Sequence, residues 1–199
     1  DFLARAGAFG HDWFGAGRTR AGDIVGGDVW RCVTALTLHA DLAHLLSNLC
    51  FGGLFVFLSC EVLGAGFGLC AIGAAGALGN LLNALLRPPD HTSIGASTAV
   101  FGALGLLVAY QWMRRNVPGH NRVRRWGPVL GGSVLLATLG MGTGRVDVIA
   151  HTTGFGAGCA LGALVGRWPV HLSFSSFTQS SLVVAAGAAL AVAWSIAIA

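Results

Sequence analysis

Six long apolar stretches, separated by short polar breaks, dominate this sequence: residues 42–60, 62–86, 93–113, 127–144, 146–166 and 182–199. A helix needs about 20 apolar residues to cross the hydrocarbon core of a bilayer. Backbone polar groups inside a bilayer need partners within their own segment, so each stretch is predicted to be a helix. Only 10% of the 199 residues are charged, whereas soluble domains carry about 25%. The sequence therefore predicts an all-α polytopic membrane protein and argues against a soluble fold.

The basic residues lie in the polar breaks, and their distribution predicts an orientation. The short loops of one side hold only Arg87 and Arg145. The break after the third stretch holds Arg114, Arg115, Arg122, Arg124 and Arg125. Basic residues of short loops collect on the cytoplasmic side, so this break is predicted to lie inside and residues 1–38 outside. The arginines form no basic amphipathic face, which argues against a nucleic-acid partner.

The pattern divides the chain into three regions. Residues 1–38 are too polar to span a bilayer and are predicted to form an outer-side loop region that contains Trp30 and Arg31. Residues 39–166 hold five of the apolar stretches and form the predicted core. Residues 167–199 are predicted to be a linker followed by an additional C-terminal transmembrane helix.

Polar side chains are costly inside a bilayer, so those near the apolar stretches are candidate functional residues. His39, His44 and Asn48 lie at the start of the first stretch. His44 and Asn48 are four residues apart and share one helix face, where their donors can reach a common point. Hydrogen bonding between helices is the alternative interpretation of this cluster.

Ser97 lies at the start of the third stretch, within Ser-Ile-Gly-Ala-Ser. A serine in the first turn of a helix is surrounded by N–H groups that have no intrahelical partner, at the positive end of the helix dipole. Such groups can bind a developing oxyanion, and Gly95 leaves space for a substrate. A helix start rich in Ser and Thr, without catalysis, is the alternative.

The fifth stretch carries His151, with Gly154 and Gly158 on the same helix face at i+3 and i+7. Glycines let another helix approach closely, which would bring His151 beside the side chains of that helix. A packing face with a hydrogen-bonded histidine is the alternative. Together the three clusters supply a nucleophile, a base and oxyanion donors, the roles that hydrolysis of a peptide bond needs.

These residues, in this order, resemble the rhomboid family of intramembrane serine proteases. The resemblance covers residues 28–166 and rests on Trp30-Arg31, the His39, His44 and Asn48 cluster, Gly95-Ala96-Ser97, and His151-x-x-Gly154-x-x-x-Gly158. It implies a rhomboid-like helical bundle with six transmembrane helices in this chain. The first five would match family helices two to six, the sixth would be an addition, and the first family helix would lie upstream of Asp1.

The resemblance also implies roles for these residues. Ser97 would be the nucleophile and His151 the general base of a dyad. His44, Asn48 and the Ser97 N–H would bind the oxyanion, with Gly95 in support. The remaining family positions would line the substrate pocket or hold the structure: His39, Trp30, Arg31, Phe101, Gly154 and Gly158. The implied partners are the bilayer and a transmembrane protein substrate, with no metal or cofactor.

The composition adds an expectation about location. Every basic residue is Arg, and Ala and Gly are abundant, which hints at a bacterial source. With residues 1–38 outside, the expected location is a bacterial inner membrane, with the active site opening to the outer side.

Several points stay open in the sequence. Thr98 stands where the family most often has Gly, and its side chain could narrow the pocket or shift the backbone donors. Asp147 lies four residues before His151 and could orient its imidazole. His91 is expected to be a solvated loop residue or a group at the pocket rim.

A catalytically inactive rhomboid-like binding or escort protein, and a small membrane transporter, are the alternative functions.

Overall fold

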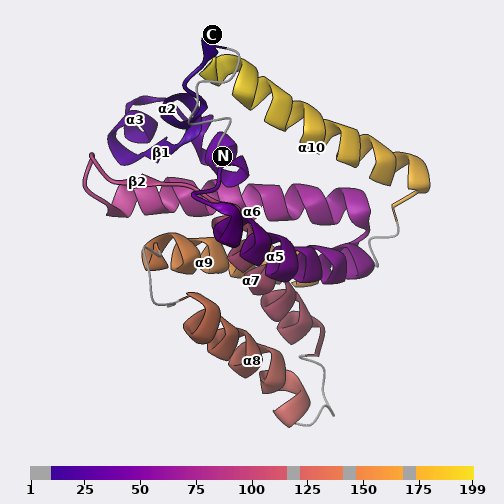
Figure 1. Cartoon of the computed structure of the whole chain (residues 1–199). Coiled ribbons are helices and arrows are strands. Elements are labelled where there is room, and N and C mark those ends of the chain that lie inside the picture. The colour runs from indigo at the N-terminus through magenta and orange to yellow at the C-terminus, as the bar shows by residue number, and fades with distance from the viewer. Residues whose placement is uncertain (1–9, 116–121, 141–146, 168–173) are drawn as a thin grey trace.

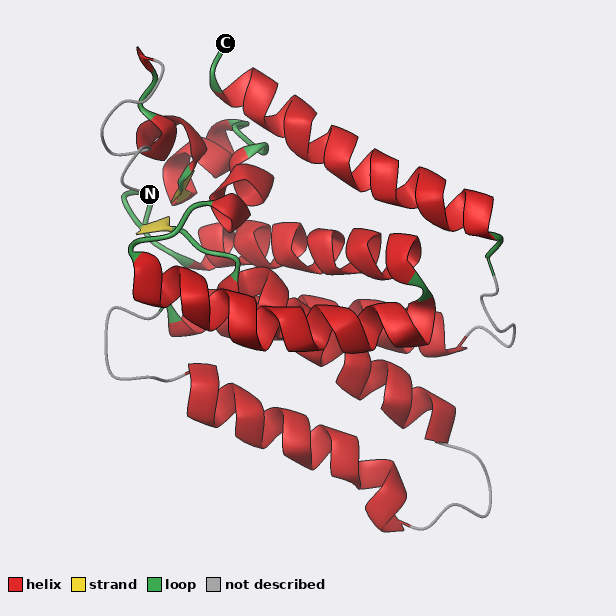
Figure 2. Ribbon diagram, turned by 45° about the vertical axis from the view of Figure 1, so that its right-hand side comes forward, coloured by secondary structure: helices red, strands yellow, loops and turns green. Residues whose placement is uncertain are grey.

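The computed structural model describes residues 10–115, 122–140, 147–167 and 174–199 (Figure 1). Its described part contains six long helices: α5 (Leu42–Leu63), α6 (Ala65–Leu86), α7 (Ser97–Arg115), α8 (Arg122–Gly140), α9 (Val148–Arg167) and α10 (Ser176–Ala197). Each predicted stretch therefore corresponds to a helix. Figure 2 shows how little of the described chain lies outside helices.

Several predicted boundaries were wrong. The third helix begins at Ser97 rather than residue 93, because Thr92–Ser93 forms a short strand, β2. The fourth begins at Arg122, ahead of the apolar run, and residues 141–144 of its predicted range lie outside the described residues. The last begins at Ser176 rather than residue 182. Apolar content alone missed the starts of α8 and α10 because a helix can extend into polar residues beyond the bilayer.

Among the described residues, four helices are long and apolar enough to cross a membrane: α5, α6, α9 and α10. In α8 the apolar part is limited to Trp126–Thr138. The helix α7 carries polar residues at both ends but is the most enclosed, packing against α9, α6, α5 and α8. Large apolar side chains are exposed along α5, α8 and α10, where they suit contact with lipid. The protein is an all-α integral membrane protein.

The central helices α7 and α9 approach each other through glycines of α9. A Cβ atom added at Gly154, Gly158 or Gly162 would collide with the backbone carbonyl of Thr98, Gly102 or Leu106, respectively. The three glycines and the three carbonyls both recur every four residues, so a seam of backbone contact runs between the helices. The seam brings the start of α7 beside the start of α9.

Residues 10–38 form a compact cap of short elements: α2 (Trp13–Gly17), β1 (Thr19–Arg20), α3 (Ala21–Gly26), α4 (Arg31–Thr34) and η2 (Ala35–Thr37). Arg31 holds the cap together, because its guanidinium donates to the carbonyls of Gly15 and Arg18 and pairs with Asp28 at 3.0 Å. The strands β1 and β2 pair antiparallel. The cap thus anchors the segment just before Ser97.

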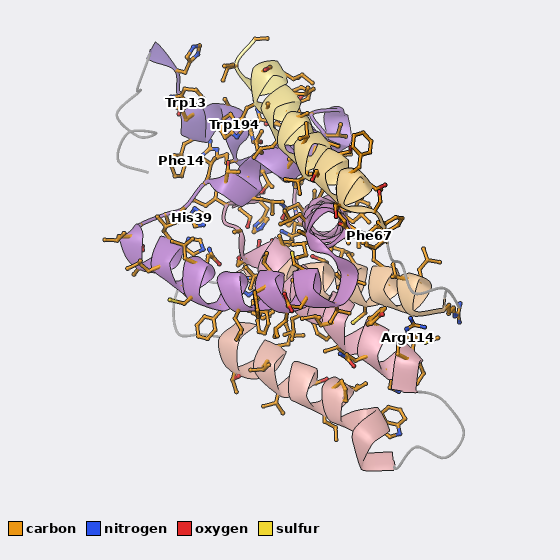
Figure 3. All side chains as sticks on the ribbon, turned by 90° about the vertical axis from the view of Figure 1, so that its right-hand side faces the viewer. Trp13, Phe14, His39, Phe67, Arg114 and Trp194 are labelled. Carbon is orange, nitrogen blue, oxygen red and sulfur yellow. The ribbon has the colours of Figure 1, made fainter. Side chains whose placement is uncertain are left out.

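The C-terminal helix α10 crosses over α6, on the opposite side of the bundle from α8 (Figures 1 and 2). At one end, Gln179 Oε1 accepts from the N–H groups of Gly66 and Phe67, the first turn of α6, and its Nε2 donates to the Leu63 carbonyl. At the other end, Trp194 packs on Trp13, with ring centroids 5.4 Å apart (Figure 3). The helix α10 is therefore fixed at both ends.

Candidate active site

Ser97 is the first residue of α7, and the segment before it is held by backbone hydrogen bonds. The Gly95 N–H donates to the Ala35 carbonyl at 2.9 Å, and the Ser93 N–H donates to Thr19 Oγ1 at 2.8 Å. The first N–H donor that bonds within the helix is that of Val100, to Ala96. The N–H groups of Ser97, Thr98 and Ala99 therefore face outward from the helix end without intrahelical acceptors.

His151 lies in the first turn of α9, and its Nε2 is 2.9 Å from Ser97 Oγ. The imidazole is 7% exposed, so bulk water reaches little of it. Phe101, one turn after Ser97, packs on the same imidazole, with ring centroids 4.5 Å apart. The geometry suits transfer of the hydroxyl proton from Ser97 to His151.

His44 approaches the same point from α5. A Cβ atom added at Gly95 would lie 2.8 Å from His44 Nε2 and 3.6 Å from Ser97 Oγ. His44 Nδ1 accepts from the Ala40 N–H at 3.3 Å. Because that nitrogen accepts, the proton of a neutral His44 belongs on Nε2, the nitrogen facing Gly95. His44 therefore presents an N–H donor beside Ser97.

Asn48 and His39 complete the first cluster. The Asn48 Nδ2 atom is buried and has no hydrogen-bond partner among the described residues. The His39 ring, which is labelled in Figure 3, meets the His44 ring edge-on, with ring centroids 5.3 Å apart. Burial lowers the pKa of His39 below its usual 6.5, and the neighbouring His44 adds to this. A neutral His39 can support the His44 ring without adding positive charge.

The side chain of Thr98 lies in the packing between helices. It is 2% exposed, and its Cγ2 would contact Cβ atoms added at Gly79 of α6 and Gly154 of α9. The side chain therefore fills space between three helices. Gly79 was missed in the sequence because glycines are common in membrane helices and its partners lie far along the chain.

Asp147 and His91 form a contact that the sequence did not predict. His91 Nε2 lies 2.7 Å from Asp147 Oδ2, which also accepts from Asn83 Nδ2 at 2.9 Å. His91 is thus half-buried and paired, so the expectation of a solvated loop residue was wrong, while its placement at a pocket rim stays a prediction. Burial acts to raise the pKa of Asp147, but hydrogen bonds from His91, Ala150 N–H and Asn83 outweigh it and hold that pKa below 3.8. Asp147 is therefore ionised at neutral pH, and its pairing loses its stabilising effect only as the pH falls through that lowered pKa.

Trp30 and Arg31 lie in the cap, where the contacts of Arg31 are with carbonyls and carboxylates of the cap itself. Gly154 and Gly158 lie in the seam between α7 and α9. Within the described residues, no group of three His, Cys, Asp or Glu side chains could hold a metal ion.

Gly95 allows a test of the geometry around His44. Gly95→Ala is expected to slow reaction of Ser97 with a serine-directed probe by about 10- to 100-fold, because a Cβ there would displace the His44 ring. Gly95 has φ +125°, a backbone region that alanine rarely adopts, and Gly27 has φ +122° with open space around it. Gly27→Ala therefore controls for backbone strain alone. Equal probe rates in the two variants would contradict the expected contact.

The fold and the site define a polytopic membrane protein with a serine–histidine pair at the start of a buried helix. The family model of the Rhomboid domain matches residues 26–168. The chain therefore belongs to the rhomboid family.

Relatives agree with this assignment. The chain is 28% identical to the rhomboid protease homologue YdcA of Bacillus subtilis over 141 residues. This alignment covers 71% of this chain and 69% of that protein. It is 36% identical over 137 residues to Rhomboid-like protease 3 of Toxoplasma gondii, covering 67% of this chain and 50% of the relative. It is 32% identical over 145 residues to RHOMBOID-like protein 7 of Arabidopsis thaliana, covering 69% of this chain and 43% of the relative. The match thus spans half or less of the latter two relatives.

Proposed function

We propose that this protein is an intramembrane serine endopeptidase that cleaves transmembrane segments of other membrane proteins with a Ser97–His151 dyad. The observation that carries the proposal is the 2.9 Å separation of Ser97 Oγ and His151 Nε2 at the start of α7. Membership of a family with relatives named as proteases supports it. An inactive escort protein has no need for this hydrogen-bonded pair, so the protease is favoured over that alternative.

The first chemical step is attack on the scissile carbonyl. Ser97 Oγ forms a bond to the carbonyl carbon while its proton passes to His151 Nε2. His151 then gives that proton to the nitrogen of the leaving segment, the C–N bond breaks, and an acyl group remains on Ser97. A water molecule, deprotonated by His151, releases the acyl group and restores the hydroxyl.

The oxyanion formed in each step needs hydrogen-bond donors. The Ser97 N–H, the His44 Nε2–H and the Asn48 Nδ2–H are proposed to supply them. A buried amide nitrogen without a partner costs about 1–3 kcal/mol. Asn48 Nδ2, which has no partner in the part of the chain that the structure describes, is therefore poised for an acceptor, which the substrate oxyanion would provide only during the reaction.

The carboxylate of Asp147 is assigned no part in proton transfer. Its oxygens bond the Ala150 N–H, Asn83 and His91. This engagement supports a dyad rather than a triad in which Asp147 orients the His151 imidazole.

The substrate is proposed to enter from the bilayer and unwind near the outer face of a bacterial inner membrane. A carbonyl inside a helix is hydrogen-bonded to an N–H four residues along the chain, so the helix must open before Ser97 can reach it. Small or helix-breaking residues near the cleavage site would make this opening easier. The arginine-rich break at residues 114–125, of which residues 116–121 lie outside the described residues, is proposed to be cytoplasmic.

A fluorophosphonate probe, which reacts covalently with activated serines, tests the proposal in detergent. The wild-type protein is expected to be labelled, and Ser97→Ala to lose the labelling completely. Ser93→Ala is the matched control, because the hydrogen bonds of Ser93 to Thr19 use its backbone and survive the substitution. A folded wild-type protein that resists labelling would refute the protease and favour the escort role.

A further inference from the structure

Asp147 forms the N-cap of α9, the helix that carries His151. Its carbonyl accepts from the His151 N–H at 3.1 Å, and its Oδ1 accepts from the Ala150 N–H at 3.2 Å. A side-chain oxygen that accepts from the third helical N–H is the usual arrangement of an N-cap. Asp147 therefore fixes the helical turn on which His151 stands.

The other carboxylate oxygen of Asp147 faces α6 and the loop that leads to Ser97. Oδ2 lies 2.7 Å from His91 Nε2 and accepts from Asn83 Nδ2, while Arg87 Nη2 lies 4.0 Å from Oδ1. The side chains of Asp147 and His91 are 14% and 19% exposed. A short hydrogen bond to a carboxylate, screened from water, holds its two partners firmly.

His91 belongs to the segment that carries Ser97. Its carbonyl accepts from the Ala21 N–H at 3.0 Å, and the next two residues form β2, which pairs with the cap. Gly95 is bonded to Ala35, and α7 begins two residues later. His91 and Ser97 therefore lie on one continuous segment that is hydrogen-bonded to the cap.

We propose that the His91–Asp147 pair positions Ser97 relative to His151. The inference rests on the proposed function, because it concerns the same nucleophile and base. His91 stands six residues before Ser97, and Asp147 stands four residues before His151. The pair thus links the segment that delivers the nucleophile to the helix start that delivers the base. Both are positioning residues, which act through Ser97 and His151 rather than by contact with the substrate.

The effect should fall on the chemical step more than on binding. A displacement of about 1 Å between reacting groups can cost about 100-fold in rate. A purely structural pair would instead lower thermal stability and leave the reaction rate of the folded protein unchanged. Saturation kinetics with the fluorophosphonate separate the two cases, because they give the maximal labelling rate, kinact, and the binding constant, KI, independently.

The experiment compares His91→Ala, Asp147→Ser and the double variant in the full chain in detergent. Serine is itself a good N-cap, so Asp147→Ser keeps the cap of α9 and removes the contact with His91. Each single variant is expected to lower kinact about 10- to 100-fold with KI within about twofold. The double variant should lose no more than the single ones, since residues that act as one pair are not additive. Asp12→Ser, at the N-cap of the remote helix α2, should leave kinact unchanged.

A second variant, His91→Gln, keeps a side-chain donor and is expected to recover part of the lost rate. It also decides the matter if His91→Ala proves too unstable to purify. Wild-type kinact in folded His91→Ala or Asp147→Ser, or additive losses in the double variant, would overturn the proposal. These results would leave the labelling of wild-type Ser97 intact, whereas an unlabelled wild type would instead refute the proposed function.

Discussion

His151→Ala is expected to slow cleavage of a transmembrane reporter by about 10³-fold, with the protein still folded. His151 Nε2 lies 2.9 Å from Ser97 Oγ, and without it no base takes the hydroxyl proton during attack. The imidazole is buried against Phe101, so some loss of packing accompanies the change. The measurement is initial cleavage rate in lipid vesicles, with a reporter whose transmembrane helix carries small, helix-breaking residues near the outer interface.

Three further variants complete this test. Ser97→Ala should abolish cleavage, and the double variant Ser97→Ala/His151→Ala should be no worse than the stronger single variant, because nucleophile and base act as a unit. His11→Ala removes an imidazole that packs on Trp13 in the cap, and it should cleave at the wild-type rate. Retention of more than a tenth of the wild-type rate in His151→Ala would contradict its role as the base.

The helices were predictable because the bilayer imposes a single, strong constraint on sequence. Each predicted stretch corresponds to a helix, and the polar residues within or beside the stretches include Ser97 and His151. What hydropathy could not give were the exact ends of the helices. The strand Thr92–Ser93 exists because Thr19, 74 residues away, bonds Ser93, and no local pattern reports such a partner.

Links between distant segments explain what the sequence missed. His91 and Asp147 are separated by 56 residues, and the spacing of Asp147 to His151 said nothing of His91. Gln179 could have been predicted to form interhelical hydrogen bonds, because a lone glutamine in the first turn of an apolar helix needs hydrogen-bond partners. The predicted stretch began at residue 182 and so left Gln179 out. Its bonds to Gly66, Phe67 and Leu63 emerge only when α10 lies across the turn between α5 and α6.

The seam between α7 and α9 connects packing to chemistry, because it sets how closely the starts of the two helices approach. Gly158→Ala is expected to lower the free energy of unfolding by about 2 kcal/mol or more, since the new Cβ would collide with the Gly102 carbonyl. A backbone carbonyl cannot swing aside as a flexible side chain can. The helices must therefore separate, and the Ser97–His151 hydrogen bond should lengthen with them.

Gly156 provides the matched control for this prediction. It lies two residues earlier on α9, and a Cβ there would meet nothing within 4 Å. Gly156→Ala should therefore be neutral or gain up to about 1 kcal/mol from helix propensity. Thermal melting and fluorophosphonate labelling of both variants give the two readouts. Gly158→Ala should melt lower and label about 10-fold more slowly or worse, whereas Gly156→Ala should match the wild type in labelling. If Gly158→Ala melted and reacted like Gly156→Ala, the seam would not hold Ser97 against His151. The distance between Ser97 and His151 would then depend only on the contacts of the loop that contains His91 and Gly95.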